Sequence, residues 1–219
     1  MRVRTEHGTV TLYRCDAGGV EFLHLPRHGL RHTIPPHRIN FKANLRALER
    51  AGATRVVATS AVGSISKRLR VGEMGLVDQF IDLSKRHQTF FDSKPVHVDM
   101  THPYDSGLQR LILGVAGTLH EKLTLGINYV SVDGPRYETA AEIRMFGILG
   151  GDVVGMTGGP EAILANELGL RYASIVVATN YAAGLQERVS HDEVERAMER
   201  TAPRLGKLLE LTVRAANGL

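Results

Sequence analysis

The chain has 219 residues, of which 43% are hydrophobic and 23% charged. This balance is typical of a folded globular domain with a substantial core and argues against a disordered chain. The chain has 27 basic and 23 acidic residues, which gives a net charge of +4. The basic residues are scattered, so this small positive excess is the only feature that favours nucleic-acid binding.

The cysteine content, the apolar runs and the histidine spacing indicate where in the cell the protein is located and whether it binds a metal. The single cysteine, Cys15, excludes an internal disulfide and fits a reducing cytoplasm. We expect neither a membrane span nor a signal peptide, because no apolar stretch has the required length. The histidines nearest to a metal-ligand spacing lack companion cysteines and carboxylates: His24, His28, His32 and His37. We therefore predict a cytoplasmic protein with no metal site.

Short apolar runs alternate with amphipathic stretches along the chain, which predicts strands alternating with helices. The predicted strands are residues 10–13, 20–25, 55–59, 76–82, 129–132, 153–155 and 172–179. The predicted helices are residues 39–51, 108–123, 139–149, 161–168 and a long terminal helix from residue 190. We therefore expect an α/β fold, a single domain over residues 1–219 with a central mixed, largely parallel sheet flanked by helices.

Local signals mark the starts of two of these helices. Thr139 with Glu142, and Ser190 with Glu193, have the spacing of a capping box. Pro203 lies inside the terminal helix and is expected to kink it.

Polar and small residues follow the predicted strand at residues 153–155. Thr157 offers a hydroxyl, and Gly158 and Gly159 let backbone approach a ligand closely at the start of the next helix. Ligands of open α/β sheets bind beyond the carboxyl ends of strands, and a helix start attracts anions. The pattern is that of an anion site, but taken alone it is better explained as a plain strand–turn–helix connection, because Gly-rich turns are common.

Asn180 follows the predicted strand at residues 172–179 and carries a different chemistry. Its amide both donates and accepts hydrogen bonds, and Ala182 nearby leaves room, so it could bind the edge of a flat heterocycle. The alternative is that Asn180 only caps a turn through its own backbone.

Three more segments place polar or aromatic groups after strands. Arg27 is a permanent cation whose geometry suits phosphate, and His28 adds a donor. Ser60 offers a hydroxyl, and Tyr137 places an aromatic ring after the strand at residues 129–132. Taken singly, Arg27 is better explained as part of a surface ion pair, Ser60 as a turn residue and Tyr137 as a half-buried core ring.

Together and in this order, the segments resemble the trimeric purine nucleoside phosphorylase and methylthioadenosine phosphorylase family. The resemblance runs from about Val10 to the C-terminus. Its most specific parts are Arg27-His28-Gly29 with His32-Thr33-Ile34, Ile39-Asn40 with Ala43-Asn44, Gly134-Pro135-Arg136, Gly155-Met156-Thr157 with Pro160-Glu161, and Asn180-Tyr181.

The resemblance implies a pentosyltransferase that cleaves purine nucleosides with phosphate, as a homotrimer and with no further cofactor. It assigns phosphate binding to Arg27, His28, Ser60, Ala61 (through its N–H) and Thr157. It assigns nucleoside binding to Met156, Tyr137, Asn180, Tyr181 and Ala182. It places His32 and His97 near the sugar 5′ position, with His97 reaching a neighbouring subunit. Asn180, Thr157 and His28 are the residues it implies in catalysis.

The residues expected to contact the edge of the base indicate which class of purine is bound. Methylthioadenosine phosphorylases have aspartates where Asn180 and Ala182 stand, and aspartates suit a 6-amino purine. An amide can instead donate to a 6-oxo group, which an ionised carboxylate cannot. We therefore expect phosphorolysis of inosine, guanosine or 5′-methylthioinosine in purine salvage. The alternatives are a 5′-methylthioadenosine phosphorylase and a non-catalytic nucleoside-binding relative.

One departure from the family pattern concerns the start of the sequence. Family members usually begin with an apolar strand and a Gly-rich loop that touches phosphate, and residues 4–10 resemble the segment that follows that loop. We therefore expect this sequence to lack that strand and loop, which would remove one wall of the phosphate site.

Overall fold

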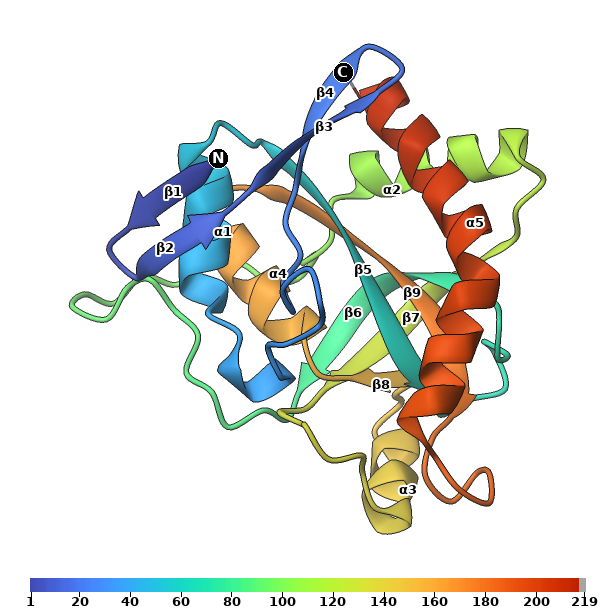
Figure 1. The fold of residues 1–219 in the computed structure, drawn as a ribbon. Helices are drawn as coiled ribbons and strands as arrows, with labels where there is room; N and C mark the ends of the chain where they lie inside the picture. The colour runs from blue at the N-terminus through green and yellow to red at the C-terminus, as the bar shows by residue number, and fades with distance from the viewer. Residues whose placement is uncertain (217–219) are drawn as a thin grey trace.

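Five strands close into a barrel at the centre of the computed structural model, which describes residues 1–216 (Figure 1). In the order in which they pair, they are β5 (Arg55–Ser64), β8 (Val153–Gly155), β7 (Leu123–Ser131), β6 (Met74–Asp82) and β9 (Arg171–Tyr181). The β5–β9, β6–β7 and β7–β8 pairs are parallel, and the β5–β8 and β6–β9 pairs are antiparallel. The mixed, largely parallel sheet is as predicted, but it is closed rather than open.

Strand β9 explains how the barrel is buried on both sides. Its odd-numbered residues Ala173, Ile175 and Val177 pack in one apolar cluster with α2 (Ser106–Thr118) and α5 (His191–Ala216). Its even-numbered residues Tyr172, Val176 and Ala178 belong to the cluster that includes α1 (Phe41–Arg50) and α4 (Gly158–Glu167). Because side chains alternate along a strand, a continuous apolar run serves both faces.

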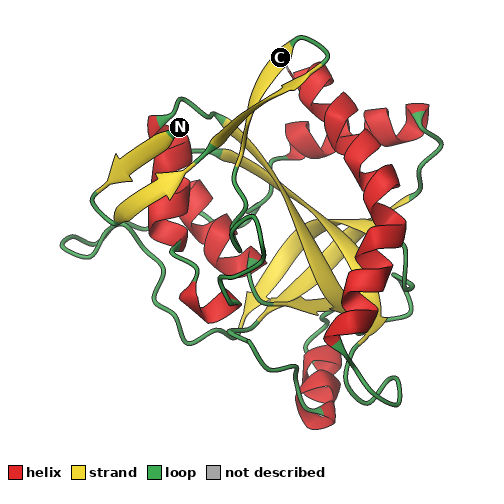
Figure 2. Ribbon diagram, in the orientation of Figure 1, coloured by secondary structure: helices red, strands yellow, loops and turns green. Residues whose placement is uncertain are grey.

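The remaining elements lie around the barrel, with the helices at its periphery (Figure 2). α3 (Ala140–Ile148) follows β7, and a short 3-10 helix, Pro36–Arg38, precedes α1. Two antiparallel hairpins precede these: β1 (Arg2–Thr5) with β2 (Gly8–Thr11), and β3 (Tyr13–Ala17) with β4 (Val20–His24). The β3–β4 hairpin reaches the end of α5, as Figure 1 shows.

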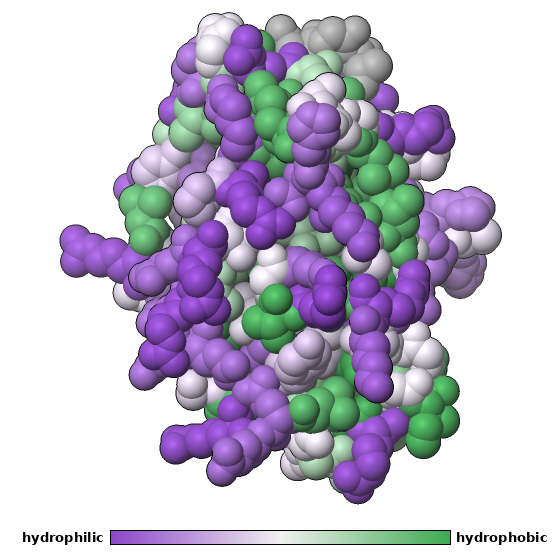
Figure 3. Space-filling view, turned by 90° about the vertical axis from the view of Figure 1, so that its right-hand side faces the viewer, coloured by the Kyte–Doolittle hydropathy of each residue, from purple (hydrophilic) through white to green (hydrophobic). Residues whose placement is uncertain are grey.

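The surface on the side of α5 is mostly polar, and apolar side chains emerge there in separate areas (Figure 3). α5 turns one face inward, since its buried residues recur every three or four positions: Ala197, Thr201, Leu205, Leu208 and Thr212. None of the helices described in residues 1–216 combines the length and apolar character needed to cross a membrane.

Several predicted element boundaries needed correction. The strand predicted at residues 10–13 is divided between β2 and β3 at the buried Leu12, and β1 was not predicted. The helix predicted to reach residue 123 ends at Thr118, and His120 turns the chain with a φ of 52°. β5 and β7 are longer than predicted, so Ser60 and Ala61 lie inside β5 rather than after it.

The two predicted capping boxes have different outcomes. At α3 both reciprocal bonds between Thr139 and Glu142 are present. At α5 the Ser190 hydroxyl accepts a bond from the Glu193 N–H, but the Glu193 carboxylate accepts from Gln186 Nε2 instead. α5 continues through Pro203 as one helix.

Candidate functional site

Three of the predicted phosphate ligands meet in space. Arg27 Nη1 lies 3.3 Å from Thr157 Oγ1 and 3.4 Å from Ser60 Oγ, and the two hydroxyls lie 3.4 Å from each other. The same Nη1 donates to the carbonyl of Thr59 at 2.9 Å. Arg27 follows β4, Ser60 lies in β5 and Thr157 follows β8, so the barrel brings together residues distant in sequence. A cation with two hydroxyls forms a site suited to an oxyanion.

A buried carboxylate holds Arg27 in this place. Arg27 Nε lies 2.8 Å from Glu161 Oε1, and the two side chains are 15% and 6% exposed. Burial is the largest single effect and disfavours the charged guanidinium, but the attraction and hydrogen bond of Glu161, together with Tyr172 and Tyr129, raise the pKa of Arg27 overall. The other oxygen, Glu161 Oε2, accepts a 2.9 Å bond from the hydroxyl of Tyr172 on β9.

The start of α4 differs from the predicted anion site in one respect. The N–H groups of Thr157 and Gly158 are not free, because both donate to Tyr129 Oη, at 3.3 and 3.2 Å. The two glycines serve packing against β7: a Cβ would lie 3.0 Å from the Tyr129 ring at Gly158 and 2.7 Å from Ser131 Oγ at Gly159. The Thr157 side chain does not cap the helix, which leaves its hydroxyl for the cluster with Arg27.

His28 follows Arg27, and its ring has a defined orientation. Its Nδ1 lies 2.9 Å from the carbonyl of Ile34, and the ring stacks on His32 with 4.4 Å between centroids. Burial lowers the pKa of His28, with smaller effects from neighbouring groups, so the neutral ring is favoured. A neutral ring that donates from Nδ1 to Ile34 has an acceptor at Nε2. The neutral form of His28 therefore carries an acceptor at Nε2, and its role in phosphate binding stays a prediction.

The predicted sugar 5′ region contains a residue that sequence reasoning missed. The His32 ring lies 5.9 Å from the ring of His191, the first residue of α5. His97 is exposed in the segment between β6 and α2, and it contacts none of these side chains among the described residues. The three imidazoles of His28, His32 and His191 thus lie in succession, starting from His28, which follows Arg27 in the chain.

Two ion pairs fix the loop between β7 and α3. Arg86 donates from Nε to Asp133 Oδ1 and from Nη2 to the Asp133 carbonyl, both at 2.8 Å. Arg136 donates to both oxygens of Glu142, at 2.8 and 2.7 Å, and these bonds lower the pKa of Glu142 to about 2. Both ends of the loop are therefore tied to neighbouring elements.

This loop carries the predicted aromatic residue and an acid that was not predicted. Tyr137 is 36% exposed, and burial and the nearby carboxylates of Glu138 and Glu193 raise its pKa. Glu138 is half-buried, and burial raises its pKa. Met156 packs against the loop, since a Cβ on Gly134 would overlap its Sδ. The loop therefore contacts Met156, the residue before Thr157, and its Tyr137 lies near Glu193 in the first turn of α5.

Asn180 lies near the end of β9, and its amide is only partly used. Nδ2 donates to the carbonyl of Tyr181 at 2.9 Å, and Oδ1 accepts from Thr179 Oγ1 at 3.0 Å. One N–H of Nδ2 and one acceptor position of Oδ1 remain without a partner among the described residues. A Cβ on Gly63 of β5 would lie 3.4 Å from Nδ2 and 3.5 Å from the buried Ala182. The contact with Tyr181 agrees with a role for Asn180 in the turn, and its remaining donor permits a ligand as well.

Strand β5 sets the distance between the two parts of the site. Ser60 belongs to the cluster with Arg27, and Gly63 lies beside Asn180. Three residues of strand span roughly 10 Å, which matches the separation between a phosphate and the base of a nucleoside whose sugar lies between them. Ala61, the exposed residue next to Ser60, lies along this path.

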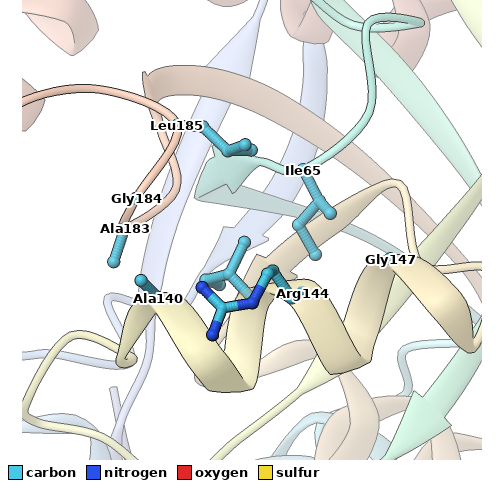
Figure 4. A pocket seen from close by; sticks show the side chains of 8 residues that line it. Ile65, Ala140, Arg144, Gly147, Ala183, Gly184 and Leu185 are labelled. Atoms are coloured by element: carbon cyan, nitrogen blue, oxygen red, sulfur yellow. The ribbon is translucent and has the colours of Figure 1, made fainter.

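Two cavities border these elements. A groove of about 630 Å³ between the β3–β4 hairpin, β5 and α5 reaches Arg27 and Glu161. A cavity of about 290 Å³ lies between α3 and residues 183–185, and Figure 4 shows Arg144 among its otherwise apolar lining. The smaller cavity contains none of the predicted site residues, so we place the site at the Arg27 cluster. Within residues 1–216, no three His, Cys, Asp or Glu side chains are arranged so that they could hold a metal ion.

Comparison with known proteins identifies the family of the chain. The sequence profile of the Phosphorylase superfamily matches residues 2–214. The chain is similar to the 6-oxopurine nucleoside phosphorylase of Pyrococcus furiosus, with 42% identity over 94% of this chain and 82% of that protein. It is 44% identical to a probable S-methyl-5′-thioinosine phosphorylase of Methanopyrus kandleri, over 95% of this chain and 82% of that protein.

The fold has solved counterparts as well. Methylthioadenosine phosphorylase from Schistosoma mansoni in complex with adenine is similar over 100% of this chain and 86% of that one, with a TM-score of 0.94 and 30% sequence identity.

Proposed function

This chain belongs to the Phosphorylase superfamily, and we propose that it cleaves 6-oxopurine nucleosides with inorganic phosphate. The products are the free purine and ribose 1-phosphate, or methylthioribose 1-phosphate, in purine salvage. The chain is thus a glycosyltransferase of the pentosyltransferase type. The observation that carries the proposal is the meeting of the Arg27 guanidinium with the hydroxyls of Ser60 and Thr157 within 3.4 Å.

The chemistry follows from where charge develops. Breaking the glycosidic bond builds positive charge on the sugar and negative charge on the purine. A phosphate held by Arg27, Ser60 and Thr157 stabilises the positive sugar and then attacks its C1 atom. The free donor of Asn180 stabilises the purine as it becomes negative, which is the general way that fixed donors lower a barrier. Holding phosphate and nucleoside next to each other along β5 accelerates the reaction further, because the two reactants are already in position.

The residues at the edge of the base favour a purine with a 6-oxo group. Asn180 can donate to the purine oxygen, and Ala182 provides no carboxylate that would accept from a 6-amino group. Glu138 adds an acceptor beside Tyr137 for the N1–H that 6-oxopurines carry and adenine lacks. A buried polar group left unpaired costs about 1–3 kcal/mol, so each mismatched contact disfavours adenine about 5- to 150-fold.

The sugar 5′ region favours a hydroxyl over a methylthio group. His32 and His191 lie together where the resemblance places that part of the sugar. Imidazole nitrogens form hydrogen bonds with a hydroxyl group, whereas a thioether sulfur is only a weak acceptor. We therefore propose inosine and guanosine as better substrates than 5′-methylthioinosine.

The proposal extends to assembly and location. We propose a homotrimer in which His97 reaches the site of a neighbouring subunit, because His97 is exposed in its segment. We also propose that residues 1–219 form one phosphorylase domain in the cytoplasm, with phosphate as co-substrate and no metal or other cofactor.

The decisive experiment compares phosphate-dependent base release from inosine, guanosine, 5′-methylthioinosine and 5′-methylthioadenosine under identical conditions. Turnover of the 6-oxo substrates with 5′-methylthioadenosine inert is the expected result. Preference for 5′-methylthioadenosine would replace the substrate class with the 6-amino one. Nucleoside binding without turnover by folded protein would identify a non-catalytic relative.

A further inference from the structure

Glu161 is a buried carboxylate that the proposed chemistry does not use directly. It lies in the first turn of α4, and its contacts are Arg27 Nε and the Tyr172 hydroxyl. Among the ion pairs of residues 1–216, the one with Arg27 is the most deeply buried. An anion beside a phosphate site weakens phosphate binding by repulsion, so its presence there requires another role.

Tyr172 fixes the orientation of this carboxylate. Burial raises the pKa of Tyr172 well above its ordinary value, so its hydroxyl remains a donor at neutral pH. Its 2.9 Å bond to Oε2 directs Oε1 toward Arg27. The ring of Tyr104 packs against Tyr172 with 5.8 Å between centroids, but the Tyr104 hydroxyl has no partner among the described residues.

The guanidinium has a single orientation that serves the site. With Nε bound to Glu161, Nη1 is directed at Thr157 and Ser60, and Nη2 has no hydrogen-bond partner within residues 1–216. Arginine binds oxyanions through a planar fork, so rotation of that plane would misdirect its donors. Glu161 controls this plane through Nε, whereas the two hydroxyls lie at Nη1.

We propose that Glu161, held by Tyr172, is a positioning residue that keeps Arg27 preorganised for phosphate. This inference rests on the proposed function. It assigns to Glu161 an effect on phosphate that does not extend to the nucleoside, because none of its contacts reaches Asn180, Tyr137 or Glu138.

The test measures the dissociation constant of inorganic phosphate on the free protein by calorimetry, together with separate KM values for phosphate and inosine. Glu161→Ala is expected to weaken phosphate binding about tenfold or more, since a displaced charged donor loses most of its contribution. Glu161→Gln keeps an oxygen for Nε and is expected to stay within about threefold of wild type. The inosine KM is expected to change less than about twofold in both.

A matched pair of tyrosine variants keeps the test decisive if Glu161→Ala does not fold. Tyr172→Phe removes a hydroxyl that binds Glu161, and Tyr104→Phe removes an equally buried hydroxyl with no partner. We expect about threefold weaker phosphate binding for Tyr172→Phe and an unchanged value for Tyr104→Phe. Thermal unfolding of each variant establishes that only folded protein is compared.

Any of four results would overturn the inference. Folded Glu161→Ala could bind phosphate as wild type does, the inosine and phosphate KM values could rise together, or the two tyrosine variants could behave alike. A wild-type protein that does not bind phosphate would overturn it as well. Phosphate binding is measured without nucleoside, so it can be tested separately from turnover. If wild-type protein binds phosphate but does not turn over nucleosides, the proposed function is refuted, and this inference is still decided by the phosphate affinities of the variants.

Discussion

Replacement of Asn180 by aspartate tests the argument about the base most directly. The change keeps the shape of the side chain and removes the Nδ2 donors. It affects two contacts: the bond to the Tyr181 carbonyl at 2.9 Å, and the free donor assigned to the purine. An ionised carboxylate in that position would face the Tyr181 carbonyl oxygen without a proton between them.

The expected loss follows from these contacts. Removing a donor that stabilises developing charge lowers kcat by about 10²–10³-fold, or roughly 2.7–4 kcal/mol. The broken bond to Tyr181 in a buried position costs about 1–3 kcal/mol of folding stability. We therefore expect kcat/KM for inosine to fall about 100-fold or more and the unfolding midpoint to fall as well. The ratio of 5′-methylthioadenosine to inosine turnover should rise, because the new carboxylate accepts from a 6-amino group.

A second asparagine provides the control. Asn128 also donates from Nδ2 to a backbone carbonyl, that of Gly150, at 2.9 Å, but it lies outside the candidate site. Asn128→Asp should lower stability without changing the ratio of substrates. Phosphorolysis of inosine by Asn180→Asp within about threefold of wild type, with unchanged base preference, would refute the reasoning about Asn180.

Three further predictions concern the other parts of the site and its support. Thr157→Ala removes one neutral phosphate donor, so the KM for phosphate should rise about 10-fold while the inosine KM stays within about twofold in steady-state assays. His191→Leu should raise the ratio of 5′-methylthioinosine to inosine turnover about 10-fold, since it replaces a hydrogen-bonding ring by an apolar side chain; an unchanged ratio would remove His191 from the sugar region. Gly158→Ala places a Cβ 3.0 Å from a buried ring and should destabilise by about 1–3 kcal/mol. Gly114→Ala in open space on α2 should instead stabilise by about 0.5–1 kcal/mol in the same denaturant titration.

The sequence predicted those features that depend on neighbours along the chain. The Thr139 capping box forms because both its bonds join residues three positions apart. The alternating strands and helices were also recovered, since periodicity is a local property. Arg27, Ser60 and Thr157 were grouped by resemblance and by their places after or near strands, and the barrel does bring them together.

Other features depend on contacts across the barrel and carry no local signal. Glu161 looks like an ordinary acid in a first helical turn, and only the fold shows that it is buried against Arg27. Tyr129 is an apolar strand residue by pattern, although its hydroxyl occupies the N–H groups that were expected to be free. His191 could have been suspected only from its place at a helix start, because its contact with His32 joins residues far apart in sequence.

The placement of Asn180 shows why such contacts decide the chemistry. The register between β5 and β9 shifts by one residue after Val62, so that Gly63 pairs with Asn180 and leaves Thr179 without a counterpart. The Thr179 hydroxyl lies 3.3 Å from the Val62 carbonyl and 3.0 Å from Asn180 Oδ1. A bulge reverses the alternation of side chains along a strand and can redirect a residue at a site. It therefore directs the Asn180 amide over Gly63, where a Cβ would contact Nδ2 at 3.4 Å and would lie closer still, at 3.2 Å, to Val154 of β8.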